Sequence, residues 1–533
     1  MNRFKSIVIS TKVLLVLLTL RSVTYSQDIY EKNDLIDIKH YTFNLTLQDE
    51  SDVIYGQTYI TFDAEPNAST AAFDLIQKSG KYGMEIMSVI AGGQIIDFTY
   101  SNNKIAIDLN QIEGSPKKVQ INYTGTPERG LVIDKTKFGK RSFFGDNWPN
   151  LARHWLPCVD HPYDKASVTF RITAPAHYDV VATGEKIEES HLSDGMKLTA
   201  YYEPTPVAMK VMTIGVTQFA SKLLGNVDDI PITAWVYPEN RLDGFSDYSP
   251  AVEVMEYFIE NIGPYPYAKL ANMQAKTQWG GLENAGNIAY NENSVTGQGT
   301  VEGLIAHEIA HQWFGNSVTE DSWNHVWLSE GFATYFTILF QENKYGNEKR
   351  KEELSTDRDQ VIAYYKSNPS PIVDPSIKDP MKVLSTNSYQ KASWVLNMLR
   401  HRIGDDHFWK GIKEYYRRFR DDNVLTSDFQ QIMEEVSGMD LETFFQQWIF
   451  TKGYPELNWS WAYDQGRLTV SIDQVQDHHT FRFPLEIGIV SDGVTRIHKV
   501  EVTAKSQTFH LDMDQKPKQV VLDPDSWLLF DDR

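Results

Sequence analysis

Between about residues 41 and 218, hydrophobic and polar residues alternate with a period of two. This period is typical of strands that bury one face against a core. Turn residues separate the runs, and no amphipathic helical pattern interrupts them. We therefore expect an all-β N-terminal domain with strands near residues 40–48, 55–64, 104–109, 118–125, 165–175 and 178–185.

Beyond about residue 237, hydrophobic residues recur every three or four positions, which predicts amphipathic helices. Several of these segments begin at Ser, Thr or Asp, and several end at Gly or Asn, as helix caps do. The expected helices cover residues 249–263, 300–316, 328–346, 391–404, 405–419 and 426–438.

The period of two returns near the end of the chain and predicts a terminal β domain. The expected strands cover residues 466–476, 481–490, 496–504, 507–513 and 518–524. We therefore predict a multidomain α+β fold. Its expected parts are an N-terminal β domain at 27–231, a mostly helical domain at 232–458 and a C-terminal β domain at 459–533.

Residues 1–26 have the pattern of a secretory signal peptide. Arg3 and Lys5 supply a basic start, and the apolar stretch at 13–20 is too short to span a bilayer as a helix. Small residues favour cleavage between Ser26 and Gln27, and an uncleaved anchor is the alternative. No later stretch is apolar and long enough to span. We therefore expect a secreted or periplasmic protein with no stable membrane insertion after cleavage.

The net charge of −20 narrows the range of partners. An acidic surface disfavours nucleic acids and anionic membranes, which both repel it. Cys158 is the single cysteine, so the chain forms no disulfide within itself, and we interpret it as a buried apolar thiol.

The segment HEIAH, from His307 to His311, carries candidate metal chemistry. On a helix, two histidines four residues apart share a face and can bind one metal ion. This arrangement suits zinc, which takes three protein ligands in hydrolases and keeps one position for water. Glu308 would remove a proton from that water and pass it to the leaving amine. Glu330, which opens the next expected helix, is the candidate third ligand.

Three further motifs make the chain resemble the M1 family of zinc aminopeptidases. Eighteen residues separate HEIAH from Glu330, and GGLEN at 280–284 resembles the family motif GxMEN, with Leu282 where Met is usual. The segment YQKASWVLNML, which begins at Tyr389, resembles the family segment that holds a catalytic tyrosine. The segments at 152–166 and 444–458 also resemble the family.

The resemblance implies a fold and a set of roles. The expected domains are an N-terminal β saddle, a thermolysin-like catalytic domain and a C-terminal β-sandwich, as in short members without the further helical domain. One zinc per chain would be bound by His307, His311 and Glu330. Tyr389 would stabilise the tetrahedral intermediate. Glu283 would bind the substrate's α-amine. The remaining expected substrate-binding residues are Gly280, Gly281, Leu282 and Asn284.

The sequence departs from the family pattern ahead of Arg153, where Asp146 and Trp148 stand at positions that usually carry Gln and another acid or amide. Asp146 is a candidate second carboxylate for the amine, and a turn residue is the equal alternative. Trp148 is a candidate for the wall of the first pocket. His325 is more readily interpreted as a structural histidine than as a partner of the metal ligands.

We therefore expect a zinc-dependent aminopeptidase that acts on peptides with free N-termini. The alternatives are a zinc endopeptidase, if Glu283 does not anchor an amine, and a non-catalytic peptide-binding protein that keeps the fold. The sequence leaves the preferred N-terminal residue and the oligomeric state open.

Overall fold

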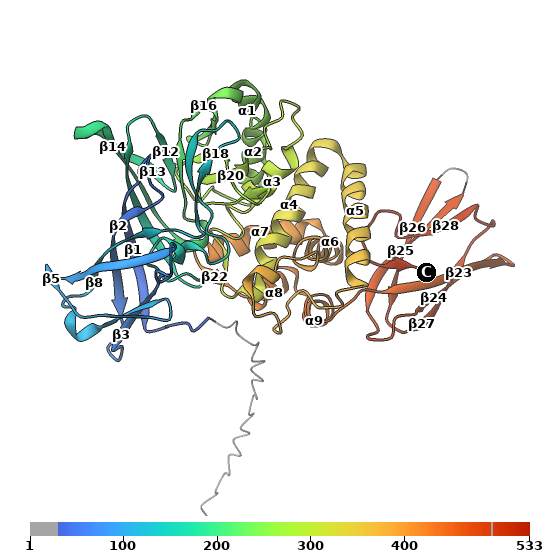
Figure 1. The fold of residues 1–533 in the computed structure, drawn as a ribbon. Coiled ribbons are helices and arrows are strands. Elements are labelled where there is room, and N and C mark those ends of the chain that lie inside the picture. The colour runs from blue at the N-terminus through green and yellow to red at the C-terminus, as the bar shows by residue number, and fades with distance from the viewer. Residues whose placement is uncertain (1–29, 492–493) are drawn as a thin grey trace, which may run out of the picture.

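The computed structural model describes residues 30–491 and 494–533. From the N-terminus, Figure 1 shows a region of sheets, a central region of helices and a separate C-terminal region of strands. The multidomain α+β prediction is confirmed at this level. Among the described residues, no helix combines the length and the apolarity that a membrane crossing requires. The predicted signal peptide lies outside the described residues.

An eight-stranded sheet dominates the N-terminal region. Its strands, in spatial order, are β13 (Glu185–His191), β14 (Met196–Ala208), β11 (Lys165–Pro175), β1 (Ile36–Thr46), β2 (Ile54–Ala64), β8 (Lys117–Thr126), β4 (Gly83–Ala91) and β5 (Gln94–Ile95). In β11, buried residues alternate strictly with more exposed ones. This alternation is the pattern that predicted the strand, because successive side chains point to opposite faces.

Two smaller sheets complete this region. One contains β12 (Asp179–Ala182), β15 (Ile214–Thr217), β10 (Arg141–Gly145) and β9 (Leu131–Lys135), and the other contains β3 (Thr70–Asp74), β7 (Lys104–Asp108) and β6 (Thr99–Ser101). The loop that follows β10 carries Asp146 and Trp148. Arg153 anchors this loop, because its side chain pairs with buried Asp160 at 3.0 Å.

The central region begins with its own five-stranded sheet. The strands, in spatial order, are β16 (Ala220–Val227), β17 (Ile230–Val236), β18 (Leu270–Ala275), β20 (Asn287–Asn291) and β19 (Gly281–Leu282). The expected boundary between residues 231 and 232 therefore falls inside β17, which pairs with β16 on one side and β18 on the other. A period of two identifies a strand but not the sheet that it joins, so the alternation alone does not place β16, which pairs with β17.

Nine α-helices are described in the central region. They are α1 (Arg241–Asp247), α2 (Ala251–Asn261), α3 (Glu302–Ala310), α4 (Trp327–Tyr345), α5 (Asn347–Tyr365), α6 (Ala392–Ile403), α7 (Asp405–Phe419), α8 (Thr426–Ser437) and α9 (Glu442–Trp448). Four of them differ from the expected helices. The helix expected to reach residue 316 ends at Ala310, although His311 keeps helical backbone angles. The sequence pattern did not predict α1, α5 or α9, and the short strands β21 (Thr319–Glu320) and β22 (Asn423–Val424) were also unexpected.

The C-terminal region contains two sheets. One contains β27 (Ser506–Asp512), β24 (Arg467–Gln474), β23 (Glu456–Asp464) and β29 (Asp531–Asp532), and the other contains β26 (Val494–Val502), β25 (Phe483–Ser491) and β28 (Gln519–Leu522). The expected boundary at residues 458 and 459 lies inside β23, so this region begins a few residues earlier.

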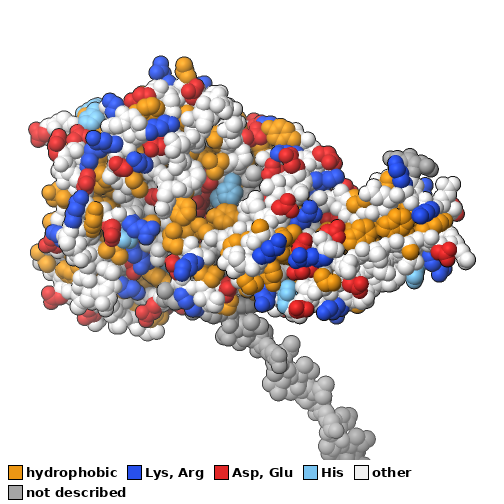
Figure 2. All heavy atoms as spheres, turned by 45° about the vertical axis from the view of Figure 1, so that its right-hand side comes forward, with side chains coloured by type: hydrophobic (Ala, Val, Ile, Leu, Met, Phe, Trp, Pro, Cys, Tyr) orange, Lys and Arg blue, Asp and Glu red, His pale blue; other side chains and the backbone are white. Residues whose placement is uncertain are grey.

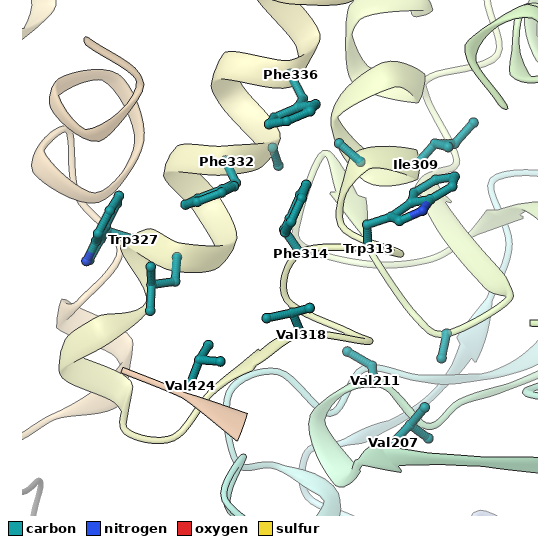
Figure 3. Packing of buried hydrophobic residues seen from close by; sticks show 14 of the residues in the cluster. Val207, Val211, Ile309, Trp313, Phe314, Val318, Trp327, Phe332, Phe336 and Val424 are labelled. Atoms are coloured by element: carbon teal, nitrogen blue, oxygen red, sulfur yellow. The ribbon is translucent and has the colours of Figure 1, made fainter. Parts of the chain in front are cut away.

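Aromatic packing fixes α3 and α4 relative to each other (Figure 3). The ring of Phe314, just beyond α3, lies 4.7 Å from the ring of Phe332 and 5.1 Å from that of Phe336, both on α4. All three side chains are buried, so their packing carries both hydrophobic and ring–ring stabilisation. The same core includes Val207 and Val211 from the N-terminal region, so the sheets and the helix pair share one interior.

A buried ion pair also joins these two regions. Lys210 Nζ lies 2.5 Å from Glu320 Oε1, and the two side chains are 1% and 0% exposed. We expect Lys210→Met to leave Glu320 as an unpaired buried carboxylate and to lower the free energy of unfolding by about 3–5 kcal/mol. Unfolding in urea, followed by tryptophan fluorescence, measures this loss. The double variant Lys210→Met/Glu320→Gln should recover most of it.

The exposed pair between Arg417 and Glu414 on α7 provides the control. Solvent screens exposed pairs, so Arg417→Met should leave the urea midpoint unchanged. Equal midpoint shifts for Lys210→Met and Arg417→Met would contradict the assignment.

Candidate active site

The three expected metal ligands meet at the junction of α3 and α4. His311 Nε2 lies 3.1 Å from His307 Nε2 and 3.2 Å from Glu330 Oε2, and His307 Nε2 lies 3.5 Å from the same oxygen. Among the described residues, these three form the group of side chains that could hold a metal ion. Figure 2 shows a hollow near the middle of the molecule with a histidine side chain inside it.

These distances fit a tetrahedral zinc ion. Bonds of about 2.0–2.2 Å from zinc to nitrogen or oxygen place neighbouring ligand atoms roughly 3.4 Å apart. The observed separations of 3.1 to 3.5 Å lie around that value. Burial also lowers the pKa of His307, which favours the neutral imidazole that metals bind. The residues present therefore fit the cofactor that the motif implies.

The other nitrogen of His311 is held by two partners. Its Nδ1 lies 3.1 Å from the carbonyl oxygen of Phe314 and 3.0 Å from Ser329 Oγ. An Nδ1–H that donates to the carbonyl leaves the Nε2 lone pair directed at the cluster. Gly315 permits this approach, because its φ is +117° and an added Cβ would lie 2.2 Å from Ser329 Oγ.

Glu308 lies buried between α3 and the edge strand β19. A Cβ added at Gly281 would lie 2.3 Å from Glu308 Oε1, whereas one added at Gly280 would meet only Leu304, at 3.8 Å. The second glycine of GGLEN is therefore needed to make room for this carboxylate. Burial, together with the charges of Glu283 and Glu330, raises the pKa of Glu308 well above its ordinary range.

Glu283 follows β19 and is 6% exposed. Its backbone carbonyl accepts hydrogen bonds from Gln312 Nε2 at 2.9 Å and from Asn316 Nδ2 at 2.5 Å. Its carboxylate Oε1 is buried and has no hydrogen-bond partner among the described residues. A buried carboxylate oxygen without a donor is costly, so this atom is suited to a cationic ligand group.

Tyr389 lies in a π-helical turn (Asn387–Lys391) directly before α6. Its ring stacks on the His307 ring, with centroids 6.1 Å apart and planes 15° apart. Burial and the nearby carboxylates of Glu330 and Glu283 raise the pKa of Tyr389 well above its ordinary value. The hydroxyl therefore keeps its proton and can donate it in a hydrogen bond.

One pocket brings most of the expected site residues together. Its lining consists of Trp148, Trp279, Gly281, Leu282, Glu283, His307, Glu308, His311, Glu330, Leu384 and Tyr389. Gly280 and Asn284, two expected substrate-binding residues, are not part of this lining. Asp146 is also outside it, because its carboxylate accepts hydrogen bonds from Thr277 Oγ1 and Trp279 Nε1.

Several residues of the site carried no recognisable sequence signal. Trp279 and Leu384 come from loops, where no periodicity marks a lining position. Gln312 directly follows HEIAH and Asn316 lies four residues further along, and this closeness to the motif was the one available hint. His325 bonds Thr426 Oγ1 of α8 at 2.8 Å, which agrees with its structural interpretation.

The pocket concentrates negative charge. Glu283, Glu308 and Glu330 are all buried in its lining. If bound positive charge keeps all three carboxylates ionised, their charge equals the three positive charges that a divalent cation and a protonated α-amine carry together. The pocket is therefore electrostatically matched to a metal ion and an amine bound together.

The sequence matches known family models over two regions. The model for the peptidase M1 N-terminal domain matches residues 38–209, and the model for the peptidase family M1 domain matches residues 247–448. The second region contains His307, Glu308, His311, Glu330 and Glu283, and the first contains Asp146 and Trp148.

Curated relatives are aminopeptidases by name. The glutamyl aminopeptidase of Sus scrofa is 29% identical over 335 residues, which are 59% of this chain and 35% of that protein. The probable aminopeptidase 2 of Sulfurisphaera tokodaii is 28% identical over 395 residues, which are 70% of this chain and 49% of that protein. The aminopeptidase A of Gloydius brevicauda is 26% identical over 78% of this chain and 46% of its own length.

The chain thus spans between a third and a half of the length of these relatives. The two family models together with the assembled HExxH and glutamate cluster identify it: the chain belongs to peptidase family M1.

Proposed function

We propose that this chain is a zinc-dependent aminopeptidase that removes single residues from peptide N-termini. The observation that carries the proposal is the pairing of a three-ligand metal cluster with the unpartnered Glu283 carboxylate in one pocket. The metal cluster supports amide hydrolysis, and the Glu283 carboxylate supports cleavage at the N-terminus of the peptide substrate.

His307, His311 and Glu330 would hold the zinc ion and leave one position open. When bound there, zinc would polarise the scissile carbonyl and lower the pKa of a water molecule. Glu308 accepts the proton of the attacking water, because its buried carboxylate faces the pocket beside the ligands. It then passes this proton to the departing amine as general acid.

Tyr389 acts on the oxygen of the scissile carbonyl. Its protonated hydroxyl, held beside His307, donates a hydrogen bond as negative charge grows on that oxygen. A preorganised donor in a buried pocket stabilises the transition state more than the ground state. The stacking of its ring on His307 orients the side chain before the substrate binds, so little reorganisation is needed.

Glu283 selects the end of the peptide. A free α-amine is mostly protonated at neutral pH and forms a charge-assisted hydrogen bond with a carboxylate. Gln312 and Asn316 fix the Glu283 backbone, so its carboxylate has a defined distance from the metal ligands. With the amine held there, the first peptide bond would be the one within reach of Glu308 and Tyr389.

Two alternative functions fit these observations less well. A zinc endopeptidase would bring an uncharged internal amide beside Glu283, leaving its buried carboxylate unpaired. A non-catalytic peptide-binding protein would not need Glu308 and Tyr389, yet both line the pocket. We further propose that the three regions are the saddle, thermolysin-like and sandwich domains of the family, and that residues 1–26 direct export.

The metal assignment predicts a separation between zinc content and turnover. The purified protein should contain one zinc per chain. We expect Glu308→Ala to retain that zinc and lose nearly all hydrolysis of an aminoacyl reporter amide, because it removes the base and no ligand. We expect Glu330→Ala to lower zinc occupancy. Atomic emission on the same samples measures the metal, and full zinc with full activity in either variant would refute the assignment.

We predict different effects on kcat when each of the two glycines before Leu282 is replaced by alanine. Gly281→Ala places a Cβ within 2.3 Å of Glu308 Oε1, so the carboxylate or the strand must move. We expect kcat to fall roughly 10²-fold, because an error of about 1 Å at the base is sufficient for that loss. Gly280→Ala meets only an ordinary contact and should keep kcat near the wild-type value. Zinc content should stay the same in both, and equal kcat values would show that Gly281 makes no room for the base.

The amine anchor predicts dependence on a free N-terminus. An N-acetylated peptide loses the positive charge that Glu283 pairs with, so it should be cleaved far more slowly than the free peptide. Glu283→Ala should slow cleavage of the free peptide and narrow the difference between the two substrates. Mass spectrometry of the products gives both the rate and the site of cleavage. Similar wild-type rates, with cuts at internal bonds, would instead support the endopeptidase.

A further inference from the structure

The pocket lining contains four apolar side chains in addition to its charged groups. We call Trp148, Trp279, Leu282 and Leu384 the apolar wall; the three glutamates, two histidines, Tyr389 and Gly281 form the rest of the lining. Trp148 comes from the loop after β10, and Trp279 comes from the loop between β18 and β19. The wall is therefore assembled from both the N-terminal and the central region.

The substrate's geometry directs its first side chain to this wall. The α-carbon of the first residue carries the amine, the scissile carbonyl and the side chain. With the amine at Glu283 and the carbonyl between Tyr389 and the histidines, the side chain must take the remaining direction. The part of the lining that carries no charged group or proton donor for the reaction is the apolar wall.

The two indole rings are held firmly. Trp279 Nε1 donates to Asp146 Oδ1 at 3.2 Å, and Asp146 Oδ2 accepts from Thr277 Oγ1 at 3.0 Å. Asp146 itself is 5% exposed. Trp148 packs edge-to-face against Trp279 at 5.9 Å and against Trp323 at 5.4 Å. Fixed rings present a defined apolar surface instead of adapting to each side chain.

We infer that this wall receives an uncharged apolar N-terminal side chain, and that Asp146 sets the position of the Trp279 ring instead of binding the substrate's amine. The inference rests on the proposed aminopeptidase function. Asp146 is thus a positioning residue that acts on specificity through one hydrogen bond.

The inference separates this chain from relatives that are named glutamyl aminopeptidases. An acidic first side chain would lose its hydration against the indoles, and the pocket lining among the described residues offers it no lysine or arginine. It would also lie near the negative charges of Glu283 and, behind Trp279, Asp146. Both effects disfavour glutamate.

Three reporter amides of similar length test the preference. The difference between leucine and glutamine amides reports apolarity, and the difference between glutamine and glutamate amides reports charge. We expect kcat/KM to fall at least roughly tenfold at each step, from leucine to glutamine to glutamate. Hydrolysis with glutamate equal to or above leucine would overturn the inference alone. Failure to hydrolyse any of the three by the zinc-loaded protein would overturn the proposed function as well.

A double-mutant cycle tests the role of Asp146. Asp146→Ala should reduce the leucine-to-glutamine ratio, and so should Trp279→Phe, which keeps a ring but removes the Nε1 donor. If Asp146 acts through that bond, adding Asp146→Ala to Trp279→Phe should change the ratio little further. Asp146→Asn keeps an acceptor and should restore most of the ratio, which distinguishes positioning from general damage to the fold.

If Asp146 instead binds the substrate's amine, a different measurement reveals it. If Asp146 bound the amine, Asp146→Ala would narrow the difference between free and N-acetylated peptides, as Glu283→Ala does, and the inference would be overturned. A matched pair elsewhere provides the control. Trp459 Nε1 donates to Asp532 Oδ1 at 3.1 Å in the C-terminal region. Trp459→Phe and Asp532→Ala should leave the leucine-to-glutamine ratio unchanged.

Discussion

Three buried carboxylates in one pocket are the constraint on which the site depends. Glu283, Glu308 and Glu330 lie close together in a buried pocket, where water is too scarce to screen their repulsion. Such an arrangement is stable only if the surrounding fold holds the groups and if positive charge compensates them. The packing of α3 on α4 holds two of the three, and the hydrogen bonds to the Glu283 backbone hold the third.

The site also depends on the junction between the N-terminal sheets and the central region. The pocket takes Trp148 from one side and its charged groups from the other. Lys210 and Glu320 pair across the same junction, and Lys210 Nζ lies 5.5 Å from the centre of the Trp323 ring, which supports Trp148. The β-rich region is therefore part of the site's wall as well as a neighbouring domain.

The metal cluster was accessible from sequence because a helix converts spacing into geometry. Histidines four residues apart must share a face, and this held although α3 ends at Ala310, since His311 keeps helical angles. Glu283 and Tyr389 have no such periodic signal and depended on the resemblance to a family. The position of Trp279 in the lining and the close approach of Gly281 to Glu308 depend on loop paths and on distances across the sheet edge, which no local pattern encodes.

Parts of the fold were also not predictable from the sequence pattern. The missed helix α5 buries Arg350, Leu354, Asp357 and Val361. These positions have helical spacing, but two of the four are charged, so a hydrophobic pattern does not reveal them. The boundary inside β17 had a different cause, because alternation is the same whichever sheet a strand joins.

Gln312 has a consequence beyond its role as a support. It directly follows His311, and its side chain holds the carbonyl oxygen of Glu283. The candidate metal ligand His311 and the proposed amine anchor Glu283 are therefore linked through Gln312, and Asn316 donates to the same carbonyl oxygen. Coupling of this kind is reciprocal in free energy. A peptide that strengthens metal retention must itself be held more tightly by the metal-loaded protein, by the same factor.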